Sequence, residues 1–356
     1  MMGLHSSSTG KVKDMFGKLA HIVEPPSIAV DLGTANTRIY AFNLGKMIEK
    51  PSSIRLVKDQ TNDVSDEYFK YINSTLVTAP LRGGVIVDLK NTISLLKPLV
   101  IKTKKLFKSP ISLACAPTDT TETERGLLRS ALLAAGASRV SVIPEVWAAA
   151  AGAGMDVTLP TAQLIVDIGD GVTDLAVFRE RRIVFSSALR VACGDIHKAV
   201  RSAIMAKYKI KVYEHEVERL TDEISTTLSQ EPSRRSIHIS GIDVVKRCEV
   251  GAWIDNKVVV DAILPVVNRI TEMIEKSLQK IPKKFHPEIM ESGICLTGGG
   301  ACIEGMGQLI AVKTHVAVKI APDPLHAVIN GASLALQSWS GKKSRWDNIT
   351  WPQLPA

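Results

Sequence analysis

Two stretches of the chain share one pattern of apolar and polar positions. Residues 28–42 read Ile-Ala-Val-Asp-Leu-Gly-Thr-Ala-Asn-Thr-Arg-Ile-Tyr-Ala-Phe, and residues 164–178 read Leu-Ile-Val-Asp-Ile-Gly-Asp-Gly-Val-Thr-Asp-Leu-Ala-Val-Phe. In each, an apolar strand-like run precedes Asp-x-Gly with small or polar residues, and a second strand-like run follows. This pattern predicts a β-hairpin with the Asp at its turn. Its repetition predicts two similar domains.

The segment between the hairpins alternates strand and helix signals. Residues 111–116 and 140–143 form short apolar runs that are typical of buried strands. Between them, Thr121 and Glu124 have the spacing of a capping box, so a helix is expected from there to near Gly136. Glu124 is therefore interpreted as a helix-start residue and not as a catalyst.

Two later patterns complete the expected core. Residues 263–278 place apolar side chains on one stripe of a helix, which favours a core-facing helix. Residues 296–301 read Leu-Thr-Gly-Gly-Gly-Ala and follow a short apolar strand. They predict a glycine-rich turn ahead of another helix.

The composition restricts the class of protein. Of 356 residues, 45% are hydrophobic and 22% charged, which suits a globular chain of about two domains. No stretch reaches the roughly 18 apolar residues of a spanning helix, and the first residues lack a secretory signal. Five widely spaced cysteines indicate neither a disulfide framework nor a zinc site, so a cytoplasmic protein is expected. The net charge of +8 suits an anionic partner such as a membrane surface, nucleic acid or nucleotide.

The predicted turns carry groups suited to a polyphosphate. Glycines let backbone N–H groups approach phosphate oxygens, the hydroxyls of Thr34, Thr37 and Thr173 can add donors, and an adjacent Asp can hold magnesium through water. A single Asp-x-Gly is more often only a tight turn with an Asx hydrogen bond. Two matching hairpins and a triple-glycine turn together favour a nucleotide held from opposite sides.

Glu145 stands at the end of an expected strand and the start of a small-residue helix, just ahead of the second hairpin. Its carboxylate could orient a water for attack on a phosphate. It could equally be a helix-start carboxylate that the helix dipole stabilises. Local chemistry leaves both interpretations open.

Together these residues resemble the actin superfamily, and most closely its bacterial MreB family. Residues 31–37 are similar to the family's first phosphate loop, residues 167–173 to its second, and residues 296–301 to its adenosine loop. The resemblance covers roughly residues 26–337.

The resemblance implies an α/β fold of the actin-like ATPase type, with two duplicated RNase H-like domains around a nucleotide cleft. Each domain is expected to carry a smaller inserted subdomain. The implied segments are a basic N-terminal extension at 1–25, domain I at 26–151 with a small subdomain near 43–90, domain II at 152–319 with one near 195–260, a return to domain I at 320–338, and a tail at 339–356.

The resemblance also implies a site for ATP or ADP with Mg²⁺. Glu145 is expected to orient the attacking water with the help of Asp167, while Asp31 and Asp167 support the magnesium through water. Glu218 is an expected ribose or base contact. The other expected nucleotide contacts are Asp31, Gly33, Thr34, Asn36, Gly169, Asp170, Gly171, Thr173, Gly194, Gly298, Gly299 and Gly300.

Three positions depart from the family pattern. Where the family has a pair of glutamates before the small-residue helix, this chain has Pro144 and Glu145, so the catalytic role is transferred only to Glu145. In the second loop, Asp170 adds a negative charge near the phosphates. Three residues after Glu218 the family has a lysine and this chain has Thr221, which removes a cation near the nucleoside. The preference for ATP over GTP is therefore open.

Both ends of the chain carry basic and apolar residues. Residues 11–23 predict a basic amphipathic helix suited to an anionic membrane surface, although a helix packed on its own domain has the same pattern. Residues 102–108 are also basic and are interpreted as a solvated helix face that can add membrane attraction or a filament contact. The tail, with Trp346 and Trp351, suits an interfacial anchor, a partner-binding segment or an ordered extension.

The function implied by the resemblance is that of a bacterial actin. Such a protein hydrolyses ATP, polymerises with itself into membrane-associated filaments at the inner face of the cell membrane, and organises cell shape or wall synthesis with membrane proteins of those processes. No nucleic-acid partner is expected. The alternative is an actin-like filament for organelle or plasmid positioning. A small-molecule kinase of the superfamily needs a carboxylate base facing a substrate pocket, and a chaperone ATPase needs a peptide-binding domain after residue 336.

Overall fold

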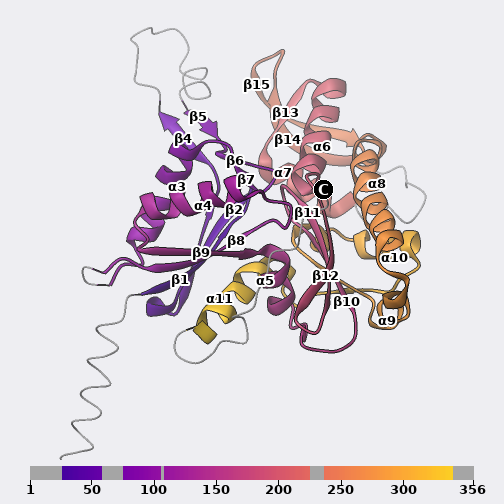
Figure 1. Ribbon diagram of the computed structural model, residues 1–356. Coiled ribbons are helices and arrows are strands. Elements are labelled where there is room, and N and C mark those ends of the chain that lie inside the picture. The colour runs from indigo at the N-terminus through magenta and orange to yellow at the C-terminus, as the bar shows by residue number, and fades with distance from the viewer. Residues whose placement is uncertain (1–25, 58–74, 106–107, 225–235, 340–356) are drawn as a thin grey trace, which may run out of the picture.

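The computed structural model of the chain describes residues 26–57, 75–105, 108–224 and 236–339 (Figure 1). The amphipathic helix predicted at 11–23 lies outside these ranges, as does the tail from residue 340 onward. Within them, no helix combines the length and the apolar character that crossing a bilayer requires.

Two five-stranded sheets with one shared topology form the centre of the molecule. The first has the order β3 (Lys46–Pro51), β2 (Asn36–Ala41), β1 (Ser27–Leu32), β8 (Ile111–Ala116), β9 (Arg139–Pro144). The second has the order β12 (Arg182–Leu189), β11 (Thr173–Arg179), β10 (Gln163–Ile168), β16 (Ile294–Thr297), β17 (Val318–Ile320). In each order the first three strands are antiparallel and the last two join in parallel. Both predicted hairpins, β1–β2 and β10–β11, are therefore confirmed.

Smaller sheets and helices surround these two. Strands β4 (Ile54–Val57) and β5 (Thr75–Thr78) pair, as do β6 (Leu81–Arg82) and β7 (Val85–Ile86), and the strands β13 (Ile210–Val212), β14 (Ser236–Asp243) and β15 (Cys248–Asp255) form a three-stranded sheet. The α-helices are α3 (Leu89–Ile101), α4 (Glu122–Ala135), α5 (Glu145–Gly152), α6 (Cys193–Tyr208), α7 (Glu214–Ile224), α8 (Asn256–Lys280), α9 (His286–Ser292), α10 (Met306–Thr314) and α11 (Ala327–Trp339). Short 3₁₀ turns are η1 (Phe42–Leu44), η3 (Lys283–Phe285), η4 (Gly299–Cys302) and η5 (Pro324–His326).

Helix α4 begins at the predicted capping box. The Glu124 N–H donates to Thr121 Oγ1 at 3.2 Å, and the Thr121 N–H donates to Glu124 Oε2 at 2.8 Å. The helix ends at Gly136, whose backbone φ is 112°. Glycine adopts this left-handed conformation without the steric strain that a Cβ atom causes in other residues. Both predicted ends of this helix are confirmed.

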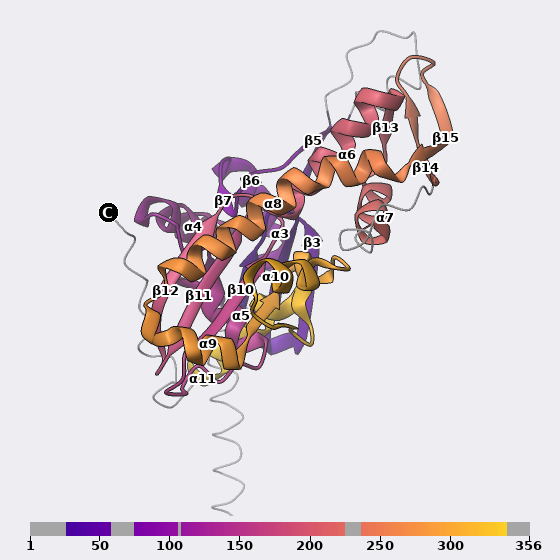
Figure 2. The same ribbon diagram turned by 90° about the vertical axis from the view of Figure 1, so that its right-hand side faces the viewer.

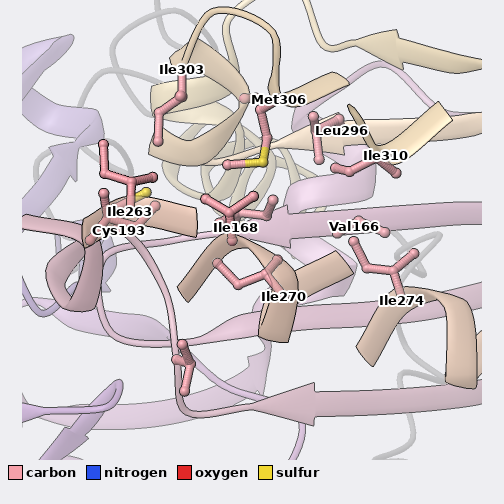
Figure 3. Close-up of a cluster of buried hydrophobic side chains, with 14 of the residues drawn as sticks. Val166, Ile168, Cys193, Ile263, Ile270, Ile274, Leu296, Ile303, Met306 and Ile310 are labelled. Atoms are coloured by element: carbon pink, nitrogen blue, oxygen red, sulfur yellow. The ribbon is translucent and has the colours of Figure 1, made fainter. Parts of the chain in front are cut away.

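Helix α8 packs a long apolar face into the hydrophobic core around the second sheet. It crosses the outer face of the second sheet and reaches the three-stranded sheet (Figure 2). Its apolar stripe, including Ile263, Ile270 and Ile274, points into the cluster that Val166 and Ile168 of β10 complete (Figure 3). The prediction that this stripe faces the core is confirmed. The apolar side chains on this face of β10 are shielded from water by the stripe.

Helices α5 and α11 lie between the two sheets (Figure 1). A side chain on Gly152 would overlap the backbone of Ala327, and one on Gly331 would overlap the backbone of Ala148. The two helices therefore cross at backbone contact, which only glycine allows at these positions. Through α11, residues Ile329, Ala332 and Leu336 extend this contact to the first sheet.

One predicted boundary differs from the structure. The small subdomain expected near 43–90 would include β3, yet β3 pairs with β2 along its whole length as a strand of the first sheet. The hairpin continues through η1 directly into β3, so the inserted part begins after residue 51. The remaining domain boundaries stay predictions.

Candidate functional site

A cavity of about 340 Å³ opens between the two sheets where the hairpin turns face each other. It is lined by the β1–β2 turn, the β10–β11 turn, the first residues of α5 and α6, helix α7, and the turns η4 and η5. The predicted site residues that line it are Asp31, Gly33, Thr34, Asn36, Glu145, Asp167, Gly169, Asp170, Gly171, Glu218, Gly298 and Gly299.

Three predicted contact residues lie behind the cavity wall and do not line it. The Thr173 hydroxyl is fully buried and donates to the Val191 carbonyl at 2.8 Å. Gly194 donates its N–H to the Asp170 carbonyl at 2.8 Å, and Gly300 packs against Ile168. These residues shape the second loop and the glycine turn from behind, because their polar or backbone groups are already used within the protein.

The first loop is held by a residue that the sequence did not single out. Ser52, in the segment after β3, donates its hydroxyl to the Gly33 carbonyl at 2.6 Å and its N–H to the Ala35 carbonyl at 2.7 Å. Its oxygen also lies 2.8 Å from Thr37 Oγ1, so the Thr37 hydroxyl is engaged inside the protein and is not a free donor. Serine in a loop has no distinctive sequence signal, which is why the pattern gave no hint of it.

The β1–β2 and β10–β11 turns approach each other at the cavity. Thr34 Oγ1 accepts a hydrogen bond from the Gly84 N–H at 3.0 Å. A side chain on Gly171 would overlap Thr34 Oγ1 and would lie 2.8 Å from the Gly84 nitrogen. Gly171 is therefore required for the close approach of the loops, and not only for a turn.

Buried carboxyl groups make the cavity acidic. Asp31, Glu145 and Asp167 line it and are 6%, 8% and 6% exposed. Burial raises the pKa of Asp31, and raises that of Asp167 to about 6. Burial and then the neighbouring Asp31 and Asp167 hold the pKa of Glu145 well above its usual range. Three acidic groups so placed favour a cation in the cavity.

Arg38 partly offsets this acidity and was not predicted as a site residue. Among the described residues that line the cavity, Arg38 alone carries a permanent positive charge. Its Nη1 lies 3.5 Å from Asp31 Oδ2, and its Nη2 lies 2.8 Å from Glu49 Oε1. A charged residue amid the alternating apolar positions of β2 is the sequence signal that could have indicated it.

Two sets of contacts join the halves of the molecule beside the cavity. Asp174 of β11 is 1% exposed and accepts hydrogen bonds from both the N–H (2.8 Å) and the hydroxyl of Thr118, which follows β8. Arg190, which follows β12, bonds Asp119 at 3.0 Å and Glu124 at 3.1 Å. The loop after β8 is thereby tied to the second sheet.

The buried Asp174 should make stability pH-dependent. Burial raises its pKa to about 7, above the roughly 3.9 of an unfolded chain. The folded state then retains a proton that the unfolded state releases, so this contribution is present below pH 4 and is lost as pH rises to 7. Asp174→Asn can keep both contacts with Thr118. Chemical denaturation should show its unfolding free energy falling less between pH 4 and 7 than that of the wild type, by about 3 kcal/mol.

A matched control for this experiment is Asp261→Asn, which changes an exposed carboxyl on α8. It should reproduce the wild-type pH profile. Equal profiles for Asp174→Asn and the wild type would show that the buried carboxyl does not titrate in this range.

The acidic groups fit a hydrated magnesium ion. Among the described residues, Asp167 Oδ1 has no hydrogen-bond partner although it is buried. The available donors are carboxylate oxygens, which Mg²⁺ prefers. Asp31 and Asp167 are the carboxylates that would hold such an ion. In the part of the chain that the structure describes, no three His, Cys, Asp or Glu side chains form a metal-binding group.

The duplicated α/β halves, with a glycine-lined acidic cavity between them, define an actin-like protein. The chain belongs to the MreB/Mbl family, because the sequence model described as MreB/Mbl protein matches residues 25–344. This confirms the family and the fold that the sequence resemblance implied.

Relatives and solved structures agree with this assignment. The cell shape-determining protein Mbl of Bacillus subtilis is 30% identical over 319 residues, which cover 87% of this chain and 96% of the relative. The cell shape-determining protein MreB of Escherichia coli is 28% identical over 323 residues, covering 87% and 93%. Crystal structures of MreB5 of Spiroplasma citri bound to ADP and to AMPPNP both have a TM-score of 0.76 at 29% identity, and cover 88% of this chain and 97% or 96% of theirs.

Proposed function

We propose that the chain is a bacterial actin that binds and hydrolyses ATP with Mg²⁺, polymerises with itself into filaments, and organises cell shape or wall synthesis at the inner face of the cell membrane. The observation that carries this proposal is the cavity in which two glycine loops face each other around three buried carboxyl groups. The names of the relatives and the nucleotides bound to MreB5 support it.

The loops would bind the phosphates through backbone N–H groups. Gly33, Thr34 and Asn36 lie at the β1–β2 turn of the first sheet, whereas Gly169, Asp170 and Gly171 lie at the β10–β11 turn of the second. A polyphosphate between them would contact both halves at once. Gly298 and Gly299 line the same cavity from the glycine turn and would approach the adenosine.

Glu145 is the best-placed residue to act on a water. It is the first residue of α5, and the preceding Pro144 is the N-cap, with an extended backbone (φ −63°, ψ 137°). Mg²⁺ held beside Asp31 and Asp167 would supply positive charge that neutralises these carboxylates and the phosphates. Glu145 can then ionise and accept a hydrogen bond from the attacking water, with Asp167 assisting its orientation.

A basic surface supports the membrane placement. Lys102, Lys104 and Lys108 are exposed in the segment between α3 and β8. The Ile111 N–H that follows donates to the carbonyl of Pro26, the first described residue, at 2.8 Å. These lysines, together with the basic residues of the sequence segment 11–23, would add attraction to anionic lipid.

Sedimentation and electron microscopy of the full-length chain with ATP and Mg²⁺, with and without anionic liposomes, test this proposal. We expect ordered filaments that are enriched on the liposomes. Lys102→Glu combined with Lys104→Glu and Lys108→Glu should lower the liposome-bound fraction several-fold and leave filaments in solution unchanged. Monomers under all conditions, with ATP still bound, would contradict the filament function and direct the search to a phosphoryl acceptor.

A further inference from the structure

Helices α6 and α7 form one wall of the cavity and are tied together by an ion pair. Arg201 Nη1 of α6 lies 2.5 Å from Glu214 Oε1 of α7. Neither of these residues lines the cavity, whereas His197 of α6 and Glu218 of α7 do. Each of the latter is four residues away from one member of the ion pair.

His197 and Glu218 lie on the cavity side of their helices. Residues four apart lie on one face of a helix, so His197 lies one turn from Arg201 toward the start of α6, and Glu218 lies one turn beyond Glu214. The start of α6 is fixed to the second loop, because the N–H groups of Cys193 and Gly194 donate to the carbonyls of Gly169 and Asp170 at 3.1 and 2.8 Å. His197 and Glu218 are therefore each one helical turn from the ion pair, and both line the cavity.

The polar groups of this pair are available to a ligand. Within the described parts of the chain, no hydrogen bond or ion pair engages the His197 ring or the Glu218 carboxylate. The His197 side chain is half-buried, and the charges of Glu214 and Arg201 act on its ring. Thr221 also lines the cavity, but its hydroxyl donates to the Val217 carbonyl at 2.9 Å. The hydroxyl donor of Thr221 is thus used within α7, and its uncharged side chain does not replace a cation at this end of the site.

The chemistry of the pair matches a nucleoside better than a phosphate. Burial lowers the pKa of His197, so its ring is neutral near pH 7 and presents one N–H donor, one acceptor nitrogen and a flat face. Glu218 supplies only acceptor oxygens when ionised, which suits hydroxyl or amino donors. A carboxylate repels phosphate oxygens, so the phosphates belong at the glycine loops.

We propose that His197, which lines the cavity together with Glu218, is a specificity-determining residue that binds the nucleoside of the nucleotide. This inference rests on the proposed nucleotide binding. It assigns to His197 a contact with the nucleoside at the end of the site where this chain has Thr221 in place of the family's lysine. His197 would contribute a hydrogen bond and a stacking face that inorganic polyphosphate cannot use.

The test is the affinity of the full-length chain for Mg²⁺–ATP and for inorganic triphosphate, measured by isothermal titration calorimetry. His197→Leu should weaken ATP binding about tenfold and leave triphosphate binding unchanged. His197→Gln, which retains an N–H donor, should recover part of the loss. His238→Leu is the matched control, because His238 lies on β14 against Trp253 and not at the cavity, and it should bind ATP like the wild type.

Two outcomes would overturn the inference. One is wild-type ATP affinity in His197→Leu, and the other is an equal loss for ATP and triphosphate, which would indicate a structural role; melting curves of each variant identify a folding defect. A wild-type chain that binds neither compound would instead refute the proposed function itself.

Discussion

Glu145→Gln is expected to lower the rate of ATP hydrolysis at least about 100-fold while ATP affinity stays within about threefold of the wild type. Glutamine has the size of glutamate but cannot take a proton from water. The side chain is 8% exposed and lies at the start of α5, so an isosteric change should not disturb the packing. The measurement is single-turnover release of phosphate, with ATP affinity determined in parallel.

Glu122→Gln is the matched control for this prediction, because Glu122 is an exposed residue in the first turn of α4. It should hydrolyse ATP at the wild-type rate. Unchanged turnover in Glu145→Gln, at unchanged affinity, would mean that another group orients the water. The same variant also decides between the two interpretations of this carboxylate, since a glutamate that only stabilises a helix start would affect stability and not turnover.

Gly331→Ala is expected to reduce the free energy of unfolding by at least about 3 kcal/mol. The added carbon would overlap the Ala148 carbonyl and would lie 2.7 Å from the Gly152 nitrogen. Both neighbours are helix backbone and cannot rotate away, so α5 and α11 must separate. Because α5 begins at Glu145, the same shift should also lower turnover. Urea denaturation followed by circular dichroism measures the loss of stability.

Gly126→Ala provides the contrast. Gly126 lies inside α4, and a side chain there would meet no atom within 4 Å. Alanine favours a helix over glycine by up to about 1 kcal/mol, so this variant should be slightly more stable than the wild type. Equal stability of Gly331→Ala and Gly126→Ala would show that the helix crossing adapts to the added carbon.

Local sequence signals were sufficient for most of the elements. The hairpins β1–β2 and β10–β11, the capping box of α4 and the core stripe of α8 were predicted from patterns of four to sixteen consecutive residues. The one boundary that differed concerns β3, an exposed strand with little apolar alternation. Its place is decided by pairing with β2, which no pattern inside β3 itself encodes.

Some residues of the candidate site were predicted from the sequence, and others were recognised only in the structure. The loops that carry Asp31 and Asp167, and the position of Glu145 at a helix start, were evident from the sequence. The roles of Ser52 and Arg38 were not, because each depends on a partner in another segment of the first sheet. Thr173 has a suitable hydroxyl for a phosphate, yet the folded chain uses it on the Val191 carbonyl.

The sequence by itself determined the two hairpin loops, because contiguous residues encode turns, caps and periodic faces through short-range hydrogen bonds and spacing. Its resemblance to the MreB family implied the family and the class of the fold. Only the tertiary structure decided which groups share the cavity. Asp174 with Thr118 and Gly152 with Gly331 are distant in the chain, as are His197 and the glycine turn. These residues become buried, shift in pKa and contact one another only when the two halves of the molecule pack together. That packing depends on many contacts between distant parts of the chain.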